Sequence, residues 1–343
     1  MTPARARTTG PRVSGGREPM RPRERRALAL LWPRVAQIPV VMFVVSVLLF
    51  WLIQVAPGDP GRNALGPYAT PDQVAEWSAA HGSTGNVLER YGAWLGGFLT
   101  GDWGTSLVYG EPVLPLVLDR FVNSIALGLF AFVILVPLGI AIGALQARRE
   151  GSRGDRATTI GLVGLASTPE FVIGVLLLVA FAVVVPILPV QSGNGVDAGL
   201  VPHLRAMTLP AVTLALAAVP LVARTSRSSI IDTTGSQHYR AAVIKGLNGR
   251  ALFTRHVARN ALIPTIALLG LYLGALLGGS AVVETLFGYP GLGELLVTAT
   301  QRKDVLVLAA GVMLTGFVSL AALLAADLAF TAIDPRVRLA GAE

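Results

Sequence analysis

The 343-residue sequence contains no cysteine, which excludes disulfides, thiolate metal sites and cysteine nucleophiles. Charged residues make up only 14% of the chain, whereas an ordinary soluble domain carries about a quarter. The four histidines, at positions 81, 203, 238 and 256, include no pair with the spacing of zinc ligands, and no G-x-x-x-x-G-K-[ST] phosphate-binding loop is present. We therefore expect no metal or other cofactor, no ATP site of the P-loop kind and no enzymatic activity in this chain.

Apolar residues, in contrast, are abundant and come in long blocks. They make up 53% of the sequence, and several blocks reach the roughly 20 residues that a helix needs to cross a bilayer. We predict an all-α membrane protein with about six transmembrane helices, at residues 38–55, 124–145, 158–185, 207–222, 262–286 and 305–333. The third segment is interrupted by Thr168-Pro169-Glu170, and Pro137, Pro169 and Pro220 are candidate kink positions.

The basic residues are distributed unevenly among the predicted loops. They concentrate before the first segment, after the second and fourth segments and after the last one, whereas the remaining loops hold few. Because cytoplasmic loops carry the excess of Lys and Arg, this pattern places both termini in the cytoplasm. It also explains the net charge of +8 without a nucleic-acid partner, which we do not expect.

The charge pattern and the apolar blocks together predict the organisation of the chain. We expect a disordered basic cytoplasmic tail at residues 1–34, a transmembrane domain at 35–338 and a short C-terminal tail at 339–343. Within the domain, residues 57–121 are predicted as an extracytoplasmic loop and residues 224–261 as a cytoplasmic loop. The outer loop is net acidic and contains an aromatic stretch from Tyr91 to Trp103, typical of a segment at the membrane interface or of a docking surface for an external partner.

The cytoplasmic loop carries a specific resemblance. It reads Tyr239-Arg240-Ala241-Ala242-Val243-Ile244-Lys245-Gly246-Leu247 and continues to Arg259-Asn260-Ala261-Leu262-Ile263-Pro264. This resembles the EAA loop of type I ABC importer permeases, and more closely its dipeptide, oligopeptide and nickel branch. Further matches to that branch follow in chain order: Pro57-Gly58-Asp59-Pro60, Gly101-Asp102-Trp103-Gly104-Thr105-Ser106, Ser167-Thr168-Pro169-Glu170-Phe171, Glu284-Thr285-Leu286-Phe287 with Pro290-Gly291-Leu292-Gly293, and Asp327 with Asp334-Pro335-Arg336. One departure is Arg240, where the general motif has an acidic residue.

The resemblance implies the type I importer permease fold, a location in the bacterial inner membrane and membrane lipid as the surroundings. It implies a second homologous permease subunit, separate ABC ATPase subunits and an extracytoplasmic solute-binding protein as partners. The loop would then be a coupling helix on the ATPase, formed by Tyr239, Arg240, Ala241, Ala242, Lys245, Gly246 and Leu247. Ala242 and Gly246 are four residues apart, so we expect them on one helix face, and Gly246 suits a helix end.

Three acidic residues in or near the apolar segments are candidates for the translocation pathway. Charges inside a membrane are costly and usually face a cavity or a partner. Glu170 follows Pro169 and could meet the amino end of a peptide or support a kink. Glu284 is expected near the outer end of the fifth segment, partly exposed, and Asp327 near the inner end of the sixth, paired with a nearby arginine.

Glycines recur every four residues on two of the predicted helices. They lie at Gly139 and Gly143 and at Gly270, Gly274 and Gly278. Such faces let membrane helices approach closely, either within one subunit or at the contact with a second permease.

Two functions from other classes stay open on the residues alone, namely an ion-coupled secondary carrier and an intramembrane enzyme. The solute, whether dipeptide, oligopeptide or nickel complex, is not fixed by the sequence.

Overall fold

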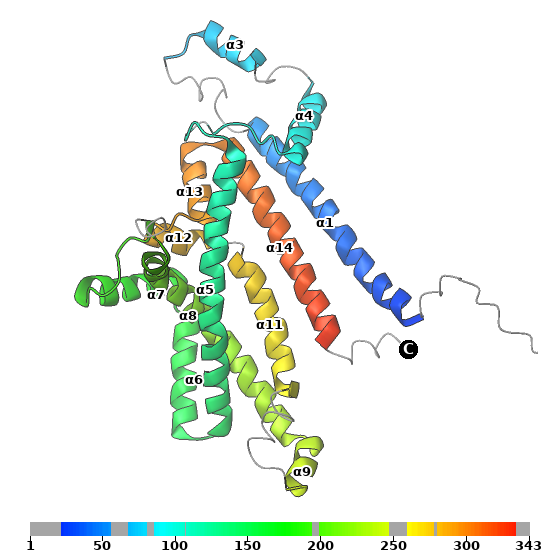
Figure 1. Cartoon of the computed structure of the whole chain (residues 1–343), viewed down its shortest axis with the longest axis vertical. Coiled ribbons are helices and arrows are strands. Elements are labelled where there is room, and N and C mark those ends of the chain that lie inside the picture. The colour runs from blue at the N-terminus through cyan, green and yellow to red at the C-terminus, as the bar shows by residue number, and fades with distance from the viewer. Residues whose placement is uncertain are drawn as a thin grey trace, which may run out of the picture.

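The structure, a computed structural model, describes residues 22–55, 68–80, 86–106, 108–193, 199–246, 259–277 and 280–333. Within them, regular secondary structure is helical, apart from one isolated antiparallel bridge between Thr105 and Pro112. The long helices run side by side in a bundle. Its two ends are marked by the short helices α9 (Gln237–Ile244) and α3 (Pro71–Ala80) (Figure 1).

Four helices are long and apolar enough to cross a membrane. They are α1 (Pro22–Val55), α5 (Val113–Arg148), α8 (Leu200–Gly235) and α14 (Val305–Ile333). Two further spans are bent pairs, in which α6 (Arg153–Ala166) is followed by α7 (Glu170–Leu178) and the π-helix η1 (Val179–Val184), and α11 (Arg259–Leu277) by α12 (Ala281–Phe287). With each bent pair counted as one span, the described residues hold up to six, and the prediction of an all-α membrane protein with about six spans is confirmed.

The first bent pair changes direction by 102° and the second by 56°. The first bend falls at Pro169, which precedes α7 and has no N–H to continue the hydrogen bonding of α6. The predicted interruption at residues 168–170 is therefore present, but it redirects the chain instead of tilting one long helix. Neither Pro137 in α5 nor Pro220 in α8 interrupts its helix.

Three helices extend beyond the apolar segments from which they were predicted. α1 begins at Pro22, so residues 22–34, expected in a disordered tail, are helical, while residues 1–21 lie outside the described part. α5 begins at Val113, inside the predicted outer loop, and α8 runs on to Gly235, inside the predicted cytoplasmic loop. Hydropathy marks the part of a helix that lies in lipid, but backbone hydrogen bonding continues into the aqueous layer, where polar side chains are hydrated.

The core of the bundle lies between α5 and α8. Leu135 on α5 packs with Val219 and Val222 on α8 and with Leu269 on α11. α14 lies against α11, and α1 lies against α14 at the edge of the bundle (Figure 1). A second buried cluster sits at the α3 end, where α5 and α14 meet the short helix α13 (Leu292–Arg302).

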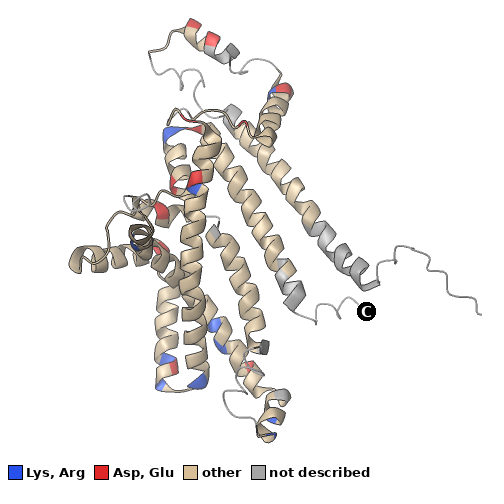
Figure 2. Cartoon of the chain, in the orientation of Figure 1, with Lys and Arg blue, Asp and Glu red and all other residues tan. Residues whose placement is uncertain are grey.

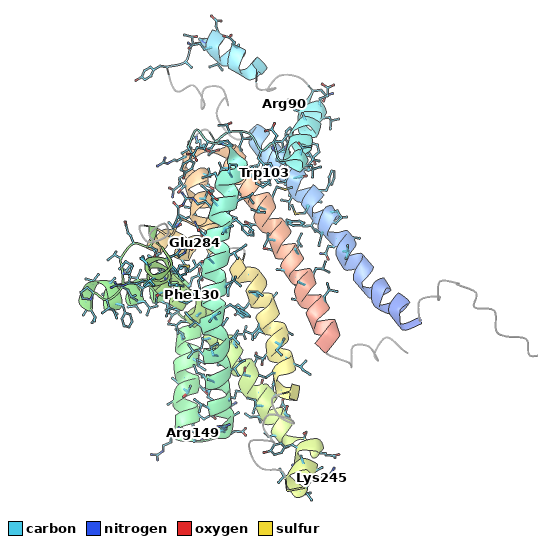
Figure 3. The ribbon with its side chains drawn as sticks, viewed as in Figure 1. Arg90, Trp103, Phe130, Arg149, Lys245 and Glu284 are labelled. Carbon is cyan, nitrogen blue, oxygen red and sulfur yellow. The ribbon has the colours of Figure 1, made fainter. Side chains whose placement is uncertain are left out.

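The two ends of the bundle differ in charge. Basic residues gather at α9 and at the turn between α5 and α6, whereas acidic residues mark α3 and α4 (Val87–Thr100) at the opposite end (Figure 2). Arg149 and Lys245 lie at the basic end, and Arg90 and Trp103 at the other (Figure 3). The positive-inside rule makes the α9 end cytoplasmic. The described start of α1 and end of α14 both point away from α3, in agreement with the predicted topology (Figure 1).

Candidate functional site

The short helix α9 follows α8 after the single residue Ser236. The hydroxyl of Ser236 accepts a hydrogen bond from the backbone N–H of Tyr239 at 3.3 Å and so caps the helix start. The helix ends at Ile244 with Lys245 as its C-cap, and Gly246 then takes a φ of +76°, a left-handed conformation that strains any residue with a β-carbon. The expectation of a helix end at Gly246 is confirmed, while Leu247 lies outside the described residues.

The surface that α9 offers differs from the predicted one. Ala242 is only 4% exposed and faces into the protein, and α9 ends before Gly246, so these two residues do not share one exposed face of the helix. The outward residues are Val243, 48% exposed, and Ile244, 85% exposed. The exposed residues beside them are Arg240, Ala241 and Lys245. An apolar pair within a basic loop was the signal in the sequence for this face.

Glu284 lies on α12 (Figure 3). It is fully buried, so its predicted partial exposure near the outer end is wrong. Its carboxylate accepts hydrogen bonds from the hydroxyl of Ser124 at 2.8 Å and from the backbone N–H of Glu294 at 3.1 Å. A β-carbon on Gly291 or Gly293 would collide with this carboxylate. Glu284 therefore holds the turn between α12 and α13 against α5.

Glu170 lies at the start of α7 and is half-buried. Its carboxylate accepts a hydrogen bond from the hydroxyl of Ser280 at 3.2 Å, and Ser280 in turn caps α12 by accepting from the N–H of Val283 at 3.3 Å. This contact brings the breaks of the two bent pairs together. No ion pair of Glu170 occurs within the described part of the chain. Asp327 lies on α14, but its side chain is outside the described residues.

The glycine series pack against helices of this same chain. A β-carbon on Gly139 would lie 2.6 Å from a methyl carbon of Val222 on α8, and one on Gly143 would lie 2.5 Å from the carbonyl oxygen of Ala223. On α11, β-carbons on Gly270 and Gly274 would meet Ala326 and Ala322 of α14 at 3.1 and 3.0 Å. These four glycines thus allow close packing between helices within this subunit, and Gly278 lies outside the described residues.

Aromatic side chains join α4 to the outer end of α1. We call Phe50, Tyr91, Trp94, Phe98 and Trp103 the aromatic ladder, because successive rings lie 5.3, 6.2, 6.0 and 4.7 Å apart. The hydroxyls of Ser46 and Tyr91 share a hydrogen bond of 2.8 Å within the same contact. The aromatic stretch predicted for the outer loop therefore anchors α4 to α1, while the acidic residues Asp72, Glu76 and Glu89 stay exposed.

Comparison with known proteins supports the resemblance to importer permeases over most of the chain. A family model described as "Binding-protein-dependent transport system inner membrane component" matches residues 136–339, and one for the N-terminal part of such components matches residues 27–128. A probable peptide ABC transporter permease protein of Sinorhizobium fredii is 33% identical over 299 residues, which cover 87% of this chain and 95% of that protein. The glutathione transport system permease protein GsiC of Escherichia coli is 33% identical over 298 residues, which cover 87% and 94%.

A putative peptide transport system permease protein of Brucella abortus is also 33% identical, over 318 residues that cover 90% of this chain and 99% of that protein. These matches cover the bent pairs, α9 and the buried turn around Glu284. They exclude the two alternative functions, a secondary carrier and an intramembrane enzyme. The chain is not itself an ATPase but works within an ABC transporter complex. It belongs to the family of inner membrane components of binding-protein-dependent transport systems and is the permease subunit of an ABC importer.

Proposed function

We propose that this permease forms half of the translocation pathway for short peptides or peptide-like solutes of the size of glutathione. The support is the shared naming of three relatives as peptide or glutathione permeases, together with similarity over about nine tenths of the chain. A second homologous permease subunit supplies the other half. ABC ATPase subunits bind the cytoplasmic end, and an extracytoplasmic solute-binding protein delivers the solute.

The observation that carries the ATPase contact is the exposed apolar pair Val243 and Ile244 at the cytoplasmic end. Covering an exposed Ile with a partner gains about 1.5–3 kcal/mol. Arg240 and Lys245 flank this pair, which gives the apolar centre and polar rim found at protein interfaces. Because only Ser236 separates α9 from α8, a force on α9 passes directly to a membrane-spanning helix.

Ile244→Asp tests this contact, with Ile244→Leu as the matched control. The aspartate replaces apolar surface with charge, so we expect at least about a ten-fold weaker ATPase association and loss of uptake, whereas the leucine variant keeps both. Affinity purification of the tagged permease from its own membranes measures the retained ATPase, and uptake by the same cells measures transport. Full ATPase retention and normal uptake in Ile244→Asp would exclude α9 as the docking helix.

We place Glu170 on the translocation pathway in this proposal. Transporter sites form where interrupted helices meet, and Glu170 sits where both bent pairs break. Its described partner is a neutral hydroxyl, so its negative charge is available to the ammonium group that a peptide carries at its amino end.

Glu170→Gln keeps the shape of the side chain and removes its charge. We expect uptake of zwitterionic and cationic peptides to fall about ten-fold, because the variant lacks the attraction for their ammonium group. Competition uptake assays at equal membrane abundance measure this change, with Glu150→Gln at the exposed cytoplasmic turn as control. Unchanged uptake would assign Glu170 to supporting the bend alone.

The exposed acids of α3 and α4 are proposed as the contact for the solute-binding protein. Asp72, Glu76 and Glu89 stand at the outer end, whereas the aromatic side chains of α4 are already packed against α1. The aromatic side therefore anchors the segment, and the acidic residues remain free to steer a partner with a basic surface.

A further inference from the structure

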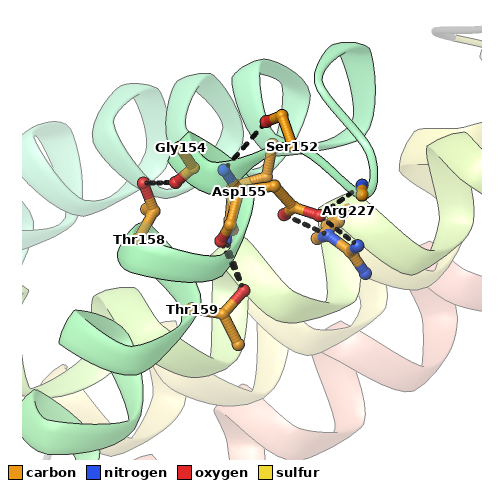
Figure 4. Close-up of polar contacts among 8 residues, drawn as sticks. Ser152, Gly154, Asp155, Thr158, Thr159 and Arg227 are labelled. Atoms are coloured by element: carbon orange, nitrogen blue, oxygen red, sulfur yellow. Dashed lines mark hydrogen bonds and ion pairs between the residues drawn. The ribbon is translucent and has the colours of Figure 1, made fainter.

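A bidentate ion pair joins α6 to α8 near the cytoplasmic end. The Nε of Arg227 donates to Asp155 Oδ1 at 3.0 Å, and its Nη2 donates to Oδ2 at 2.8 Å (Figure 4). The side chain of Asp155 is 5% exposed and that of Arg227 is 30% exposed. Two parallel N–H···O bonds between planar groups fix orientation as well as distance, so the pair limits how α6 can slide or rotate against α8.

The acid of this pair is built into the turn between α5 and α6. The backbone N–H of Gly151 donates to Asp155 Oδ2 at 3.1 Å, and the N–H of Asp155 donates to the hydroxyl of Ser152 at 3.1 Å (Figure 4). About one turn beyond Asp155, Gln146 Nε2 of α5 donates to the hydroxyl of Thr159 of α6 at 3.0 Å. The two helices are thus tied into one hairpin, and Arg227 holds that hairpin at its turn.

The other side of α8 is tied at the neighbouring residue. The hydroxyls of Ser226 on α8 and Thr265 on α11 share a hydrogen bond of 3.2 Å. Adjacent residues of α8 therefore hold α6 and α11, the first helices of the two bent pairs. Farther along the same helix, beyond Ser236, lies α9. Because α9 continues from α8 after Ser236 alone, a displacement of α9 reaches this point of α8 along the helix itself.

We propose that Asp155 and Arg227 are positioning residues for the coupling step, which make the α5–α6 hairpin follow α8 when the ATPase displaces α9. The inference rests on the proposed docking of the ATPase on α9. Without the pair, α8 moves while α6 lags behind, and the break at Glu170 is not rearranged. A second ion pair, between Arg120 and Glu294, lies at the opposite end and is a single contact of 3.5 Å.

A charge exchange tests this role. Asp155→Arg, Arg227→Asp and the double exchange are each purified as the assembled transporter and reconstituted into liposomes. ATP hydrolysis and solute uptake are then measured on the same vesicles. We expect each single variant to lower the solute moved per ATP about ten-fold, with hydrolysis within about two-fold of the parent, and the double exchange to recover most of that loss.

Arg227→Lys refines the test because lysine keeps the charge but cannot form two parallel bonds. We expect its ratio of solute to ATP to lie between those of the parent and of Arg227→Asp. Arg224→Asp, at an exposed position one turn away on α8, is the matched control and keeps the parental ratio.

Two results would overturn the proposal. One is an unchanged ratio in both single variants. The other is a parallel fall of hydrolysis, uptake and assembled complex that the exchange does not reverse, which assigns the pair to folding. Failure of the ATPase docking itself looks different, because Ile244→Asp then retains the ATPase subunits and normal uptake whatever the ion-pair variants do.

Discussion

The outer and cytoplasmic ends of the bundle are held together in different ways. At the outer end, buried hydrogen bonds join segments that are far apart in the chain. The hydroxyl of Ser106 donates to Asp304 at 2.5 Å, Ser124 donates to Glu284, and the hydroxyl of Tyr289 donates to the carbonyl of Asn123 at 2.9 Å. At the cytoplasmic end, the Asp155–Arg227 pair and a hydroxyl contact link α8 to its neighbours.

This difference indicates which end of the bundle can change its helix packing during transport. A buried hydrogen bond to a charged group contributes about 1.5–3 kcal/mol, and at the outer end the carboxylates of Asp304 and Glu284 each accept a further hydrogen bond from a backbone N–H, of Val108 and Glu294 respectively. We therefore expect the outer end to move as one unit. The cytoplasmic end depends on a few side-chain contacts around α8, and there a push on α9 can change the packing.

The largest effect should come from Glu284→Ala at the outer end. The change leaves the hydroxyl of Ser124 and the N–H of Glu294 buried without their acceptor, and it should lower the free energy of unfolding by about 3 kcal/mol. Denaturant titration in detergent, followed by circular dichroism, measures this. Glu111→Ala, exposed at the same end, should stay close to the parent. Equal stability of the two variants would contradict the view that buried hydrogen bonds hold the outer end together.

Overpacking the contact between α5 and α8 should come next. In Gly143→Val the new side chain meets the carbonyl of Ala223, since a β-carbon there already lies 2.5 Å from it, and the cost should be about 1–3 kcal/mol. Gly161→Val on α6 is the control, because nothing lies within 4 Å of a β-carbon at that position. The same unfolding titration distinguishes them. If Gly143→Val is as stable as the parent, α5 and α8 pack less closely at this position than the structure shows.

The smallest effect is expected for Arg120→Ala. Its ion pair with Glu294 is partly exposed and has a single contact, so its removal should change stability by less than about 1 kcal/mol and leave uptake unchanged. Comparing the uptake of this variant with that of Arg227→Asp then distinguishes an ion pair without a role in transport from one that transport requires. A strong uptake defect in Arg120→Ala would show that the outer end also rearranges.

The number and order of the spans could be predicted because lipid demands about 20 apolar residues for each crossing, whatever the tertiary packing. The ends of α5 and α8 could not, since helical hydrogen bonding continues past the apolar segment. Glu284 was recognised as unusual from its charge, but its burial depends on Ser124, which is distant in the sequence. The resemblance located α9, yet whether Ala242 or Ile244 faces outward depends on how α9 packs against α8.

The Asp155–Arg227 pair was missed for a related reason. Arg227 was assigned to a loop, because the apolar segment of the fourth helix ends near residue 222. In the structure it lies on α8, facing the turn between α5 and α6. A signal did exist in the sequence: Asp155 is an acid within a turn that also holds Arg148, Arg149, Arg153 and Arg156. An acid among so many bases suggests a partner but does not identify which arginine it is.

The aromatic ladder has a practical consequence for spectroscopy. All five tryptophans of the chain occur at positions 32, 51, 77, 94 and 103, so its tryptophan emission comes from the N-terminal third, with Trp94 and Trp103 in the ladder itself. Movement of α8 and α9 then leaves the native tryptophan emission unchanged unless it disturbs α1 or α4. A single tryptophan introduced at Val243 would supply a reporter at the opposite end, read against this built-in reference.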